Sequence, residues 1–230
     1  MTVVAVMPIK QLENAKQRLA GMLSAAERSE LFTAMVRDVL ETVIQCANVD
    51  RSLVITSDEA VAQLALEYGA EVLPEPETPG LIPAVTAAAE VLRERGVEVM
   101  LFLPGDVPLV TEEELNIVLA DIEQATPPHM TIAPAGDLGG SNCVACCPPD
   151  CMPFGFGVDS FRRHLRLARE AGVAARVTKL PGVGLDIDTP EDLAELTKQI
   201  DQRGDDSHTG QILKALAIRE RLQAGTAAQA

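Results

Sequence analysis

The sequence predicts a single α/β domain in which helices flank a mostly parallel, mixed β-sheet. Apolar runs of strand length alternate with amphipathic helical stripes from residue 3 to about residue 200, which is the pattern of successive βαβ units. A chain of 230 residues is long enough to bury a sizeable core in one such domain. Capping boxes and glycines mark where several of the expected helices begin and end.

The first hundred residues alternate between strand and helix. The first strand is expected at residues 3–7, and Ser24 with Glu27 forms a capping box at the start of the first helix. The elements expected after that helix are a strand at 53–56, a helix closed by Gly69, a strand at 70–73, an alanine-rich helix at 84–95 and a central strand at 97–103. Helical crossovers of this kind join parallel strands with a right-handed sense.

The second half of the chain begins with another capping box, formed by Thr111 and Glu114. The elements expected next are strands at 130–134 and 142–147, a helix with Ser160 as its N-cap, a strand at 176–180 and a helix capped by Thr189-Pro190. We therefore expect residues 1–200 to form the domain. Residues 201–230 are expected to form a polar linker, a short C-terminal helix and a frayed tail.

Charge and hydropathy limit the partners of the protein. The chain has 19 Lys and Arg against 34 Asp and Glu, a formal charge of −15, which argues against a nucleic-acid-binding surface. The amino terminus has no basic n-region, and no segment approaches the length of a membrane span. The sequence predicts a cytoplasmic protein with no membrane or nucleic-acid partner, and with a homodimer as a possible assembly.

Four of the five cysteines lie between residues 143 and 151. Thiolates at short spacing suit zinc or an iron–sulfur cluster. No second Cys or Cys-His pair completes such a set, and residues 142–147 also have the pattern of a strand of small apolar side chains. We therefore interpret these cysteines as core residues. The histidines His129, His164 and His208 are scattered without a paired acid or nucleophile motif, and we assign them no chemistry.

Three aspartates lie where strands are expected to end. Asp106 follows the central strand, and Asp186 and Asp188 have the period-two spacing that places both side chains on one side of an extended segment. Each of them alone is typical of a turn or a cap. As a set they favour a divalent cation, because Mg²⁺ uses one or two carboxylates together with substrate phosphates.

Three cations directly follow the first strand, where open α/β sheets bind ligands. Lys10, Lys16 and Arg18 are the residues concerned, and they predict an anionic ligand. The chain has no Walker motif and no Gly-x-Gly-x-x-Gly after its first strand, which excludes a P-loop and disfavours a dinucleotide-binding domain. Gly157 precedes the helix expected at Ser160, and a helix N-terminus preceded by glycines is a natural phosphate site.

Five motifs, in this order, resemble one known family. They are Pro8-x-Lys10 with Ala15-Lys16-x-Arg18-Leu19, Leu103-x-Gly105-Asp106-x-Pro108, Gly140-Ser141-Asn142, Phe156-Gly157-x-x-Ser160 and Leu185-Asp186-x-Asp188-Thr189-Pro190. The chain resembles the CofC type of 2-phospho-L-lactate guanylyltransferase over residues 3 to about 197. Bacterial members are similar and act as phosphoenolpyruvate guanylyltransferases in making a deazaflavin coenzyme.

The resemblance implies a GT-A-like fold, akin to the molybdenum-cofactor nucleotidyltransferases, and a role for each motif. Asp106, Asp186 and Asp188 would hold Mg²⁺, while Lys10, Lys16, Arg18 and Gly105 would bind GTP. Asp106 and Lys16 would be catalytic, and Ser141, Gly157 and Ser160 would bind the small phosphorylated acid.

Two positions depart from the family pattern. Ser141 stands where most members have Thr, which keeps a hydroxyl, and Ile82 stands where members have an Asn that helps to position the nucleotide. The implied reaction is attack by a phosphate oxygen of the acid on the α-phosphorus of GTP, with release of pyrophosphate.

Two other interpretations stay open at this point. A GT-A glycosyltransferase also uses an Asp-x-Asp pair, although that pair is expected after a middle strand, where this chain has Gly105-Asp106. The non-enzyme alternative is an inactive relative or a cysteine-based metal or redox module.

Overall fold

The computed structural model describes residues 1–12, 15–204 and 206–227. Its strands are β1 (Val3–Pro8), β2 (Arg51–Ile55), β3 (Glu71–Leu73), β4 (Val99–Phe102), β5 (His129–Pro134), β6 (Ser141–Cys147) and β7 (Ala174–Val177). Its α-helices are α1 (Ala25–Gln45), α2 (Glu59–Glu67), α3 (Leu81–Glu94), α4 (Glu112–Gln124), α5 (Ser160–Glu170), α6 (Pro190–Arg203), α7 (His208–Ala215) and α8 (Ile218–Ala227). None of these helices, over the part of the chain described, has the length and apolarity needed to cross a membrane.

One sheet contains all seven of these strands, in the order β3-β2-β1-β4-β6-β5-β7. The pairs β1/β2, β1/β4, β2/β3 and β5/β7 are parallel, and β6 runs antiparallel to both of its neighbours, β4 and β5. The expected mostly parallel, mixed α/β sheet is therefore confirmed, and β6 is the strand that runs in the opposite direction.

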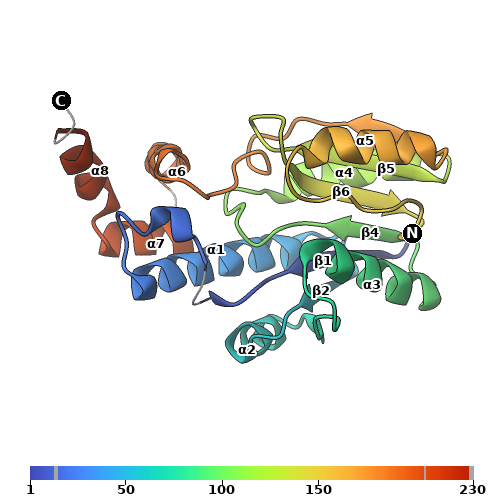
Figure 1. The fold of residues 1–230 in the computed structure, drawn as a ribbon, viewed down its shortest axis with the longest axis horizontal. Helices are drawn as coiled ribbons and strands as arrows, with labels where there is room; N and C mark the ends of the chain where they lie inside the picture. Colours follow the sequence, from blue (N-terminus) through green and yellow to red (C-terminus); the bar gives the residue numbers. More distant parts are fainter. Residues whose placement is uncertain (13–14, 205, 228–230) are drawn as a thin grey trace.

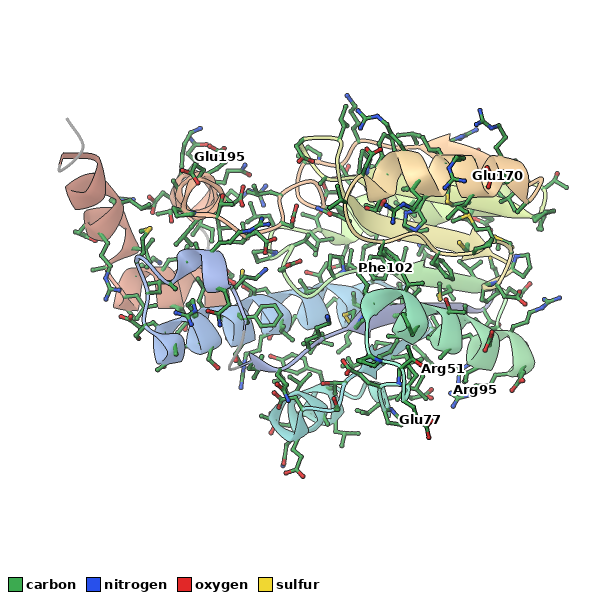
Figure 2. The ribbon with its side chains drawn as sticks, in the orientation of Figure 1. Arg51, Glu77, Arg95, Phe102, Glu170 and Glu195 are labelled. Atoms are coloured by element: carbon green, nitrogen blue, oxygen red, sulfur yellow. The ribbon has the colours of Figure 1, made fainter. Side chains whose placement is uncertain are left out.

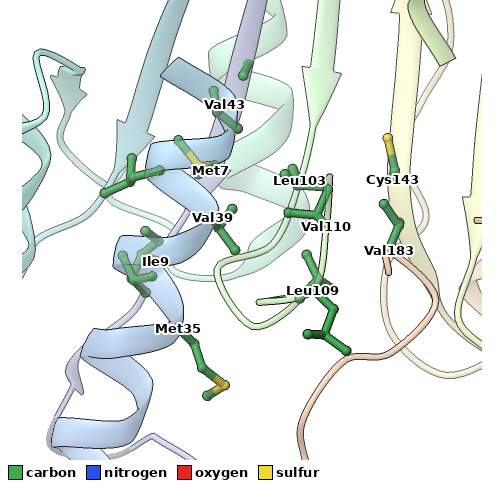
Figure 3. Packing of buried hydrophobic residues seen from close by; sticks show 14 of the residues in the cluster. Met7, Ile9, Met35, Val39, Val43, Leu103, Leu109, Val110, Cys143 and Val183 are labelled. Carbon is green, nitrogen blue, oxygen red and sulfur yellow. The ribbon is translucent and has the colours of Figure 1, made fainter. Parts of the chain in front are cut away.

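Helices cover both faces of the sheet (Figure 1). Alternate side chains of β1 separate the two cores, since Ala5 and Met7 pack with α1 and α4 while Val4 and Val6 pack with α3 and α5. In Figure 3, Met35, Val39 and Val43 of α1 lie toward the segment after β4 that carries Leu103, Leu109 and Val110. On the opposite face, Phe102 lies in the interior in Figure 2, and its ring centroid is 4.4 Å from that of Phe156.

The three capping boxes place the helices that flank the site. Ser24 with Glu27 and Thr111 with Glu114 cap α1 and α4 as expected, and at α6 the box is completed by Thr189 and Asp192. The helix expected at 84–95 begins three residues earlier, at Leu81. Gly80 adopts φ 137° as its N-cap, and Pro83 is tolerated in the first turn.

Ser160 is not the N-cap of α5, so that prediction is wrong by one residue. The N-cap is Asp159, which has φ 55° and no side-chain capping bond, and Ser160 is the first residue of the helix. The Ser160 N–H closes a turn onto the Gly157 carbonyl at 3.1 Å. Its hydroxyl forms a hydrogen bond with Ser141 of β6 instead of capping the helix.

The C-terminal region contains two helices where one was expected. α6 extends to Arg203, past the expected boundary at residue 200, and α7 and α8 follow. The Asp38 carboxylate of α1 accepts hydrogen bonds from the backbone N–H groups of His208 and Thr209, at 2.9 and 2.8 Å, which fixes the start of α7. The domain boundary stays a prediction, and residues 228–230 of the expected frayed tail lie outside the described residues.

The cysteines are free thiols; on β6, Cys143 and Cys146 lie in the core and Cys147 is partly buried. Cys143 and Cys146 are both 0% exposed, and burial raises the pKa of the Cys143 thiol to about 12, which keeps it neutral. Within the described residues, the three-membered group of closely spaced potential metal ligands is Asp38, Glu41 and His208 and contains no cysteine. The packing of β6 therefore agrees with cysteines used as small core side chains.

The connections to β1 create a switch point in the sheet. From β1 the chain passes through α1 to β2 on one side, and later through α3 to β4 on the other side. Loops that leave the carboxyl ends of β1 and β4 therefore diverge, and this is where open α/β sheets bind ligands. Lys10, Lys16 and Asp106 lie on these two loops.

Candidate active site

Lys16 lies between two of the predicted aspartates. Its Nζ donates to Asp106 Oδ2 at 2.5 Å and to Asp188 Oδ1 at 3.0 Å, so it joins the loops after β1 and β4 to the segment before α6. The Lys16 side chain is 5% exposed, and its Nζ also lies 5.4 Å from the ring centroid of Phe32. The position between these carboxylates is therefore one that suits a cation.

The backbone places Lys16 at some energetic cost. It has φ 54° and ψ 43°, a left-handed conformation, and it precedes the short 3-10 helix Gln17–Leu19, whose Leu19 is fully buried. Such a conformation costs a non-glycine residue about 1 kcal/mol or more and persists only where surrounding contacts impose it. Burial lowers the pKa of Lys16, but Asp106 and Asp188 together outweigh burial and raise it above 10.5, so the ammonium stays charged.

Asp186 is held by Asn142. The Asn142 Nδ2 donates to Asp186 Oδ1 and to the Val183 carbonyl, both at 2.9 Å. Burial raises the pKa of the Asp186 carboxyl, and the negative charges of Asp106 and Asp188 act in the same direction against the Asn142 bond. The Ile187 N–H also donates to the Asp106 carbonyl at 3.1 Å, which ties this segment to the end of β4.

A β-bulge gives Ser141 and Asn142 their directions. On β5, Ala133 and Pro134 pair with Cys143 and Ser141, so Asn142 is the extra residue on β6. Strict alternation would place Asn142 on the α5 face of the sheet together with Val144. The bulge reverses this, so Asn142 reaches Asp186 while Ser141 faces α5.

Ser141 and Ser160 meet on the α5 side of the sheet. The Ser160 Oγ lies 3.2 Å from Ser141 Oγ, and Ser141 Oγ lies 2.9 Å from Nδ1 of His164. The Gly155 N–H donates to His164 Nε2 at 2.9 Å, and His164 is 0% exposed. Gly157, in the same loop, has φ 103°, a conformation that favours glycine.

The remaining predicted residues lie on the β1 side. Lys10 is exposed and, with Gln11, Lys16, Ser57, Glu75 and Gly80 among others, lines a cavity of about 380 Å³. Arg18 is 72% exposed, with Nη1 3.7 Å from Asp188 Oδ2. Gly105 allows close packing, because a Cβ there would lie 3.0 Å from Cγ2 of Val36.

The structure thus groups the predicted residues into two sets that flank Asp106. The structure does not bring the three aspartates together. Among the described residues, carboxylate oxygens of Asp106, Asp186 and Asp188 do not all lie within 4.8 Å of one another. Lys16 bridges two of them, and Asn142 holds the third. Ile82 is 38% exposed on α3 and is not among the described residues that line the cavity.

Sequence reasoning missed Asn142, His164 and Glu75. Asn142 belongs to a motif that was noted for its serine, and the spacing of four between Ser160 and His164 places both on one face of a helix. Glu75 lies two residues after the expected third strand, so the rule that ligands lie at carboxyl ends of parallel strands could have identified it. The Asp38–Glu41–His208 group is explained by its capping of α7.

Known proteins are similar to this chain over nearly its whole length. Phosphoenolpyruvate guanylyltransferase of Conexibacter woesei is 39% identical over 217 residues, which are 94% of this chain and 97% of that protein. The 3-phospho-D-glycerate guanylyltransferase of Colwellia psychrerythraea is 34% identical and covers 82% of this chain and 88% of its own. The 2-phospho-L-lactate guanylyltransferase of Methanothermobacter thermautotrophicus is 30% identical, with coverages of 98% and 96%.

The fold is also found among solved structures. A putative nucleotide-diphospho-sugar transferase from Desulfovibrio desulfuricans superposes with a TM-score of 0.75 at 19% identity, over 96% of this chain and 99% of that one. This likeness confirms the expected GT-A-like, nucleotidyltransferase-type fold. The family described as "Guanylyl transferase CofC like" matches residues 3–229. The chain therefore belongs to the family of CofC-like guanylyl transferases.

Proposed function

We propose that this protein transfers GMP from GTP to the phosphate of a three-carbon phosphorylated acid and releases pyrophosphate. The observation that carries this proposal is the division of the site around Asp106. Cations gather on the β1 side, while hydroxyls and a glycine turn gather on the α5 side. A reaction that joins two phosphate-bearing molecules needs two such binding regions next to each other.

The β1 side suits the triphosphate. Lys10 and Lys16 line the cavity, and Arg18 Nη1 lies 3.7 Å from Oδ2 of Asp188, which also pairs with Lys16. Cations at the carboxyl end of β1 attract an anionic ligand to this edge of the sheet. The cavity volume of about 380 Å³ leaves space beyond Lys16 for a nucleoside.

Glu75 supports guanine as the base. Among the described residues that line the cavity, Glu75 carries the carboxylate, and Ser57 Oγ donates to its Oε2 at 3.3 Å. The Watson–Crick edge of guanine presents two neighbouring donors, N1–H and N2–H, which a carboxylate accepts together. Adenine, cytosine and uracil do not offer two adjacent donors. Glu75 can therefore position the base in this chain, in which Ile82 replaces the Asn of other family members.

The α5 side suits a small phosphorylated acid. Ser141 and Ser160 are 7% and 3% exposed, and both are positioned by hydrogen bonds before any ligand arrives. The N-terminus of α5 lies beside them and favours negative charge. The acceptors named for the three relatives above are all three-carbon phosphorylated acids. We propose the same class here, with phosphoenolpyruvate or 2-phospho-L-lactate preferred to 3-phosphoglycerate.

The three aspartates are the candidates for holding a divalent cation, once Lys16 leaves its position between two of them. The Lys16 ammonium already lies between Asp106 and Asp188, and the raised pKa of Asp186 reflects burial beside two other negative charges. We propose that Asp106, Asp186 and Asp188 hold Mg²⁺, which when bound neutralises charge on the triphosphate. Lys16 would then direct its ammonium to the phosphates.

The chain's own residues provide alignment and charge. A phosphate oxygen of the acid is already ionised near neutral pH, so no protein base is required. That oxygen forms the new bond to the α-phosphorus of GTP, the bond from the α-phosphorus to the β-phosphate oxygen breaks, and pyrophosphate leaves with the electron pair. Lys10, Lys16 and Arg18 hold the triphosphate while Ser141 and Ser160 hold the acid in line with it. We propose that the product enters deazaflavin coenzyme synthesis.

A matrix of donors and acceptors tests this function. Pyrophosphate release is measured with each of the four ribonucleoside triphosphates against phosphoenolpyruvate, 2-phospho-L-lactate, 3-phosphoglycerate and unphosphorylated lactate as a control. We expect release with GTP and a phosphorylated three-carbon acid, and a product mass equal to GMP joined to that acid. Release that depends on a sugar phosphate instead, with background rates for every three-carbon acid, would contradict the proposal.

A further inference from the structure

We propose that His164 is a positioning residue that keeps one hydroxyl hydrogen of the Ser141–Ser160 pair free to bind the anionic acceptor. The inference rests on the proposed function, because it assigns the acceptor to these two serines. The sequence alone indicates no chemical role for His164. The geometry around its two ring nitrogens determines the direction of every hydrogen bond in the group.

The tautomer of His164 follows from the Gly155 contact. A backbone N–H can only donate, so the 2.9 Å bond from Gly155 makes Nε2 the acceptor. Burial lowers the pKa of His164 to about 4, against a hydrogen bond with the Ser160 backbone that raises it, and the nearby charge of Arg163 also lowers it. The ring is therefore neutral near pH 7. A neutral ring with a bare Nε2 carries its hydrogen on Nδ1. The Nδ1–H therefore donates to Ser141 Oγ at 2.9 Å.

The direction of this bond decides what the serines can offer a ligand. Two hydroxyls have two hydrogens, and the 3.2 Å contact between Ser160 and Ser141 uses one of them. Because His164 donates to Ser141, it cannot accept the second hydrogen, which remains for a phosphate or carboxylate oxygen. With the opposite tautomer, Ser141 would donate to Nδ1 and Ser160 would donate to Ser141. Both hydrogens would then be used within the protein.

The surroundings keep the ring in one orientation. The Phe156 ring packs edge-on against it with centroids 4.7 Å apart at 74°, and Phe154 lies 6.4 Å away on a similar edge contact. His164 is 0% exposed, so water does not compete for either nitrogen. A hydrogen-bonded group that is preorganised in this way loses little entropy when the ligand binds.

Two amide variants separate this role from simple packing. In His164→Asn, the side-chain amide nitrogen takes the position of Nδ1 and still donates to Ser141, but nothing reaches Gly155. In His164→Gln, the amide reaches the position of Nε2 and can accept from Gly155, but it does not donate to Ser141. A purely structural role, in which the ring anchors the Gly155 loop, predicts that Gln is the better replacement.

We expect the opposite order in the KM for phosphoenolpyruvate. In His164→Gln no N–H fixes the direction of the Ser141 hydroxyl, so its hydrogen bond to the charged acceptor is weakened. We expect this variant to raise the KM for phosphoenolpyruvate on the order of 10-fold while the KM for GTP stays constant. The KM of His164→Asn for phosphoenolpyruvate should stay within about 3-fold of that of the unchanged protein, since the donor to Ser141 is retained. His208→Asn, at a half-exposed histidine on α7, is the matched control and should have no effect on either KM.

A double-mutant cycle adds a second readout. In a Ser141→Ala background the His164→Gln change should raise the KM for phosphoenolpyruvate no further, because the hydroxyl that His164 orients is gone. Additive effects would overturn the proposal.

Nitrogen-15 NMR of the unchanged protein tests the tautomer directly and does not depend on whether any variant folds. The chain has three histidines, so the His164 ring can be assigned by comparison with His164→Asn. We expect a neutral ring protonated at Nδ1 near pH 7. A ring protonated at Nε2 would overturn the inference even if guanylyl transfer is observed. An Nδ1–H ring in a protein that transfers GMP to no three-carbon acid would instead contradict the proposed function alone.

Discussion

The two sides of the candidate active site offer different chemical groups to an anionic ligand. On the β1 side the groups are full charges on long side chains, with Lys10 exposed and Arg18 72% exposed. On the α5 side the groups are neutral hydroxyls, 7% and 3% exposed, held by a buried histidine. The first arrangement attracts a highly charged ligand and can move with it. The second selects a small ligand with fixed geometry.

Lys16 shows why the difference matters. Its ammonium is occupied by Asp106 and Asp188, so the proposed function requires it to exchange partners when a triphosphate and a divalent cation bind. No such exchange is needed at Ser141, which already has a hydrogen to offer. The comparison suggests that donor binding reorganises the site and that acceptor binding does not.

The largest effect is expected from Asp188→Asn. This change removes a charge but little volume from a side chain that is 46% exposed, so the fold should persist. Turnover should fall on the order of 100-fold or more, as for other charged groups that act on the transferring phosphate. Asp150→Asn, which alters an exposed aspartate paired with Arg93, is the control. A fully active Asp188→Asn protein would remove the basis for a metal site here.

A smaller and more selective loss is expected from Lys16→Ala. Removing this ammonium should weaken GTP binding on the order of 10- to 100-fold and leave binding of the acid nearly unchanged, because the two ligands lie on different sides. Calorimetry with each ligand separately measures both values, with the exposed Lys198→Ala as control. Equal losses for both ligands would break the comparison between the sides.

The next effect concerns the base. Glu75→Gln should reduce the preference for GTP over inosine triphosphate, which lacks the N2 amino group, by about 10-fold. The control is Glu77→Gln, because Glu77 is exposed on the same loop and points away from the body of the molecule in Figure 2. If both nucleotides bind equally to the unchanged protein, Glu75 does not accept a hydrogen bond from the N2 amino group, and the proposed paired contact with guanine is wrong.

The two sides also differ in how their charges respond to pH. This difference affects the stability of the protein and is expected to change its activity least. The pKa of His164 is lowered to about 4 in the folded protein from 6.5, so the unfolded chain binds the extra proton first as the pH falls. The contribution of neutral His164 to the free energy of unfolding is fully present above about pH 6.5. It is lost as the pH falls from about 6.5 to 4, by at most about 3 kcal/mol. The raised pKa of Lys16 keeps its charge throughout this range.

Urea unfolding of the unchanged protein and of His164→Asn at about pH 7 and pH 5 measures this loss. The unchanged protein should lose more stability than the variant on acidification. Identical losses would show that His164 is not held neutral by the fold.

Local sequence signals predicted most of the framework. The capping boxes at Ser24 and Thr111 fix where α1 and α4 begin, because both partners of each box lie within one helical turn. The position of Asp106 after β4 was also predictable locally, since the end of an apolar run defines the end of a strand. These features depend on residues that are close in sequence, which is why pattern reasoning finds them.

The parts that were missed depend on long-range packing. The bulge at Asn142 exists only because β5 and β6 pair out of step, and the bond from His164 to Ser141 joins residues 23 apart. Lys16 adopts a left-handed backbone that its sequence does not favour, since partners 90 and 172 residues away hold it. No local pattern contains this information.

The division of the site is tested most directly by a crystal structure with a non-hydrolysable GTP analogue, Mg²⁺ and phosphoenolpyruvate bound together. We predict the guanine base beside Glu75, the triphosphate on Lys10, Lys16 and Arg18, and the phosphate of the acid within hydrogen-bond distance of Ser141 or Ser160. A complex with the acid on the β1 side, or with the nucleotide against Ser141 and Ser160, would contradict the account.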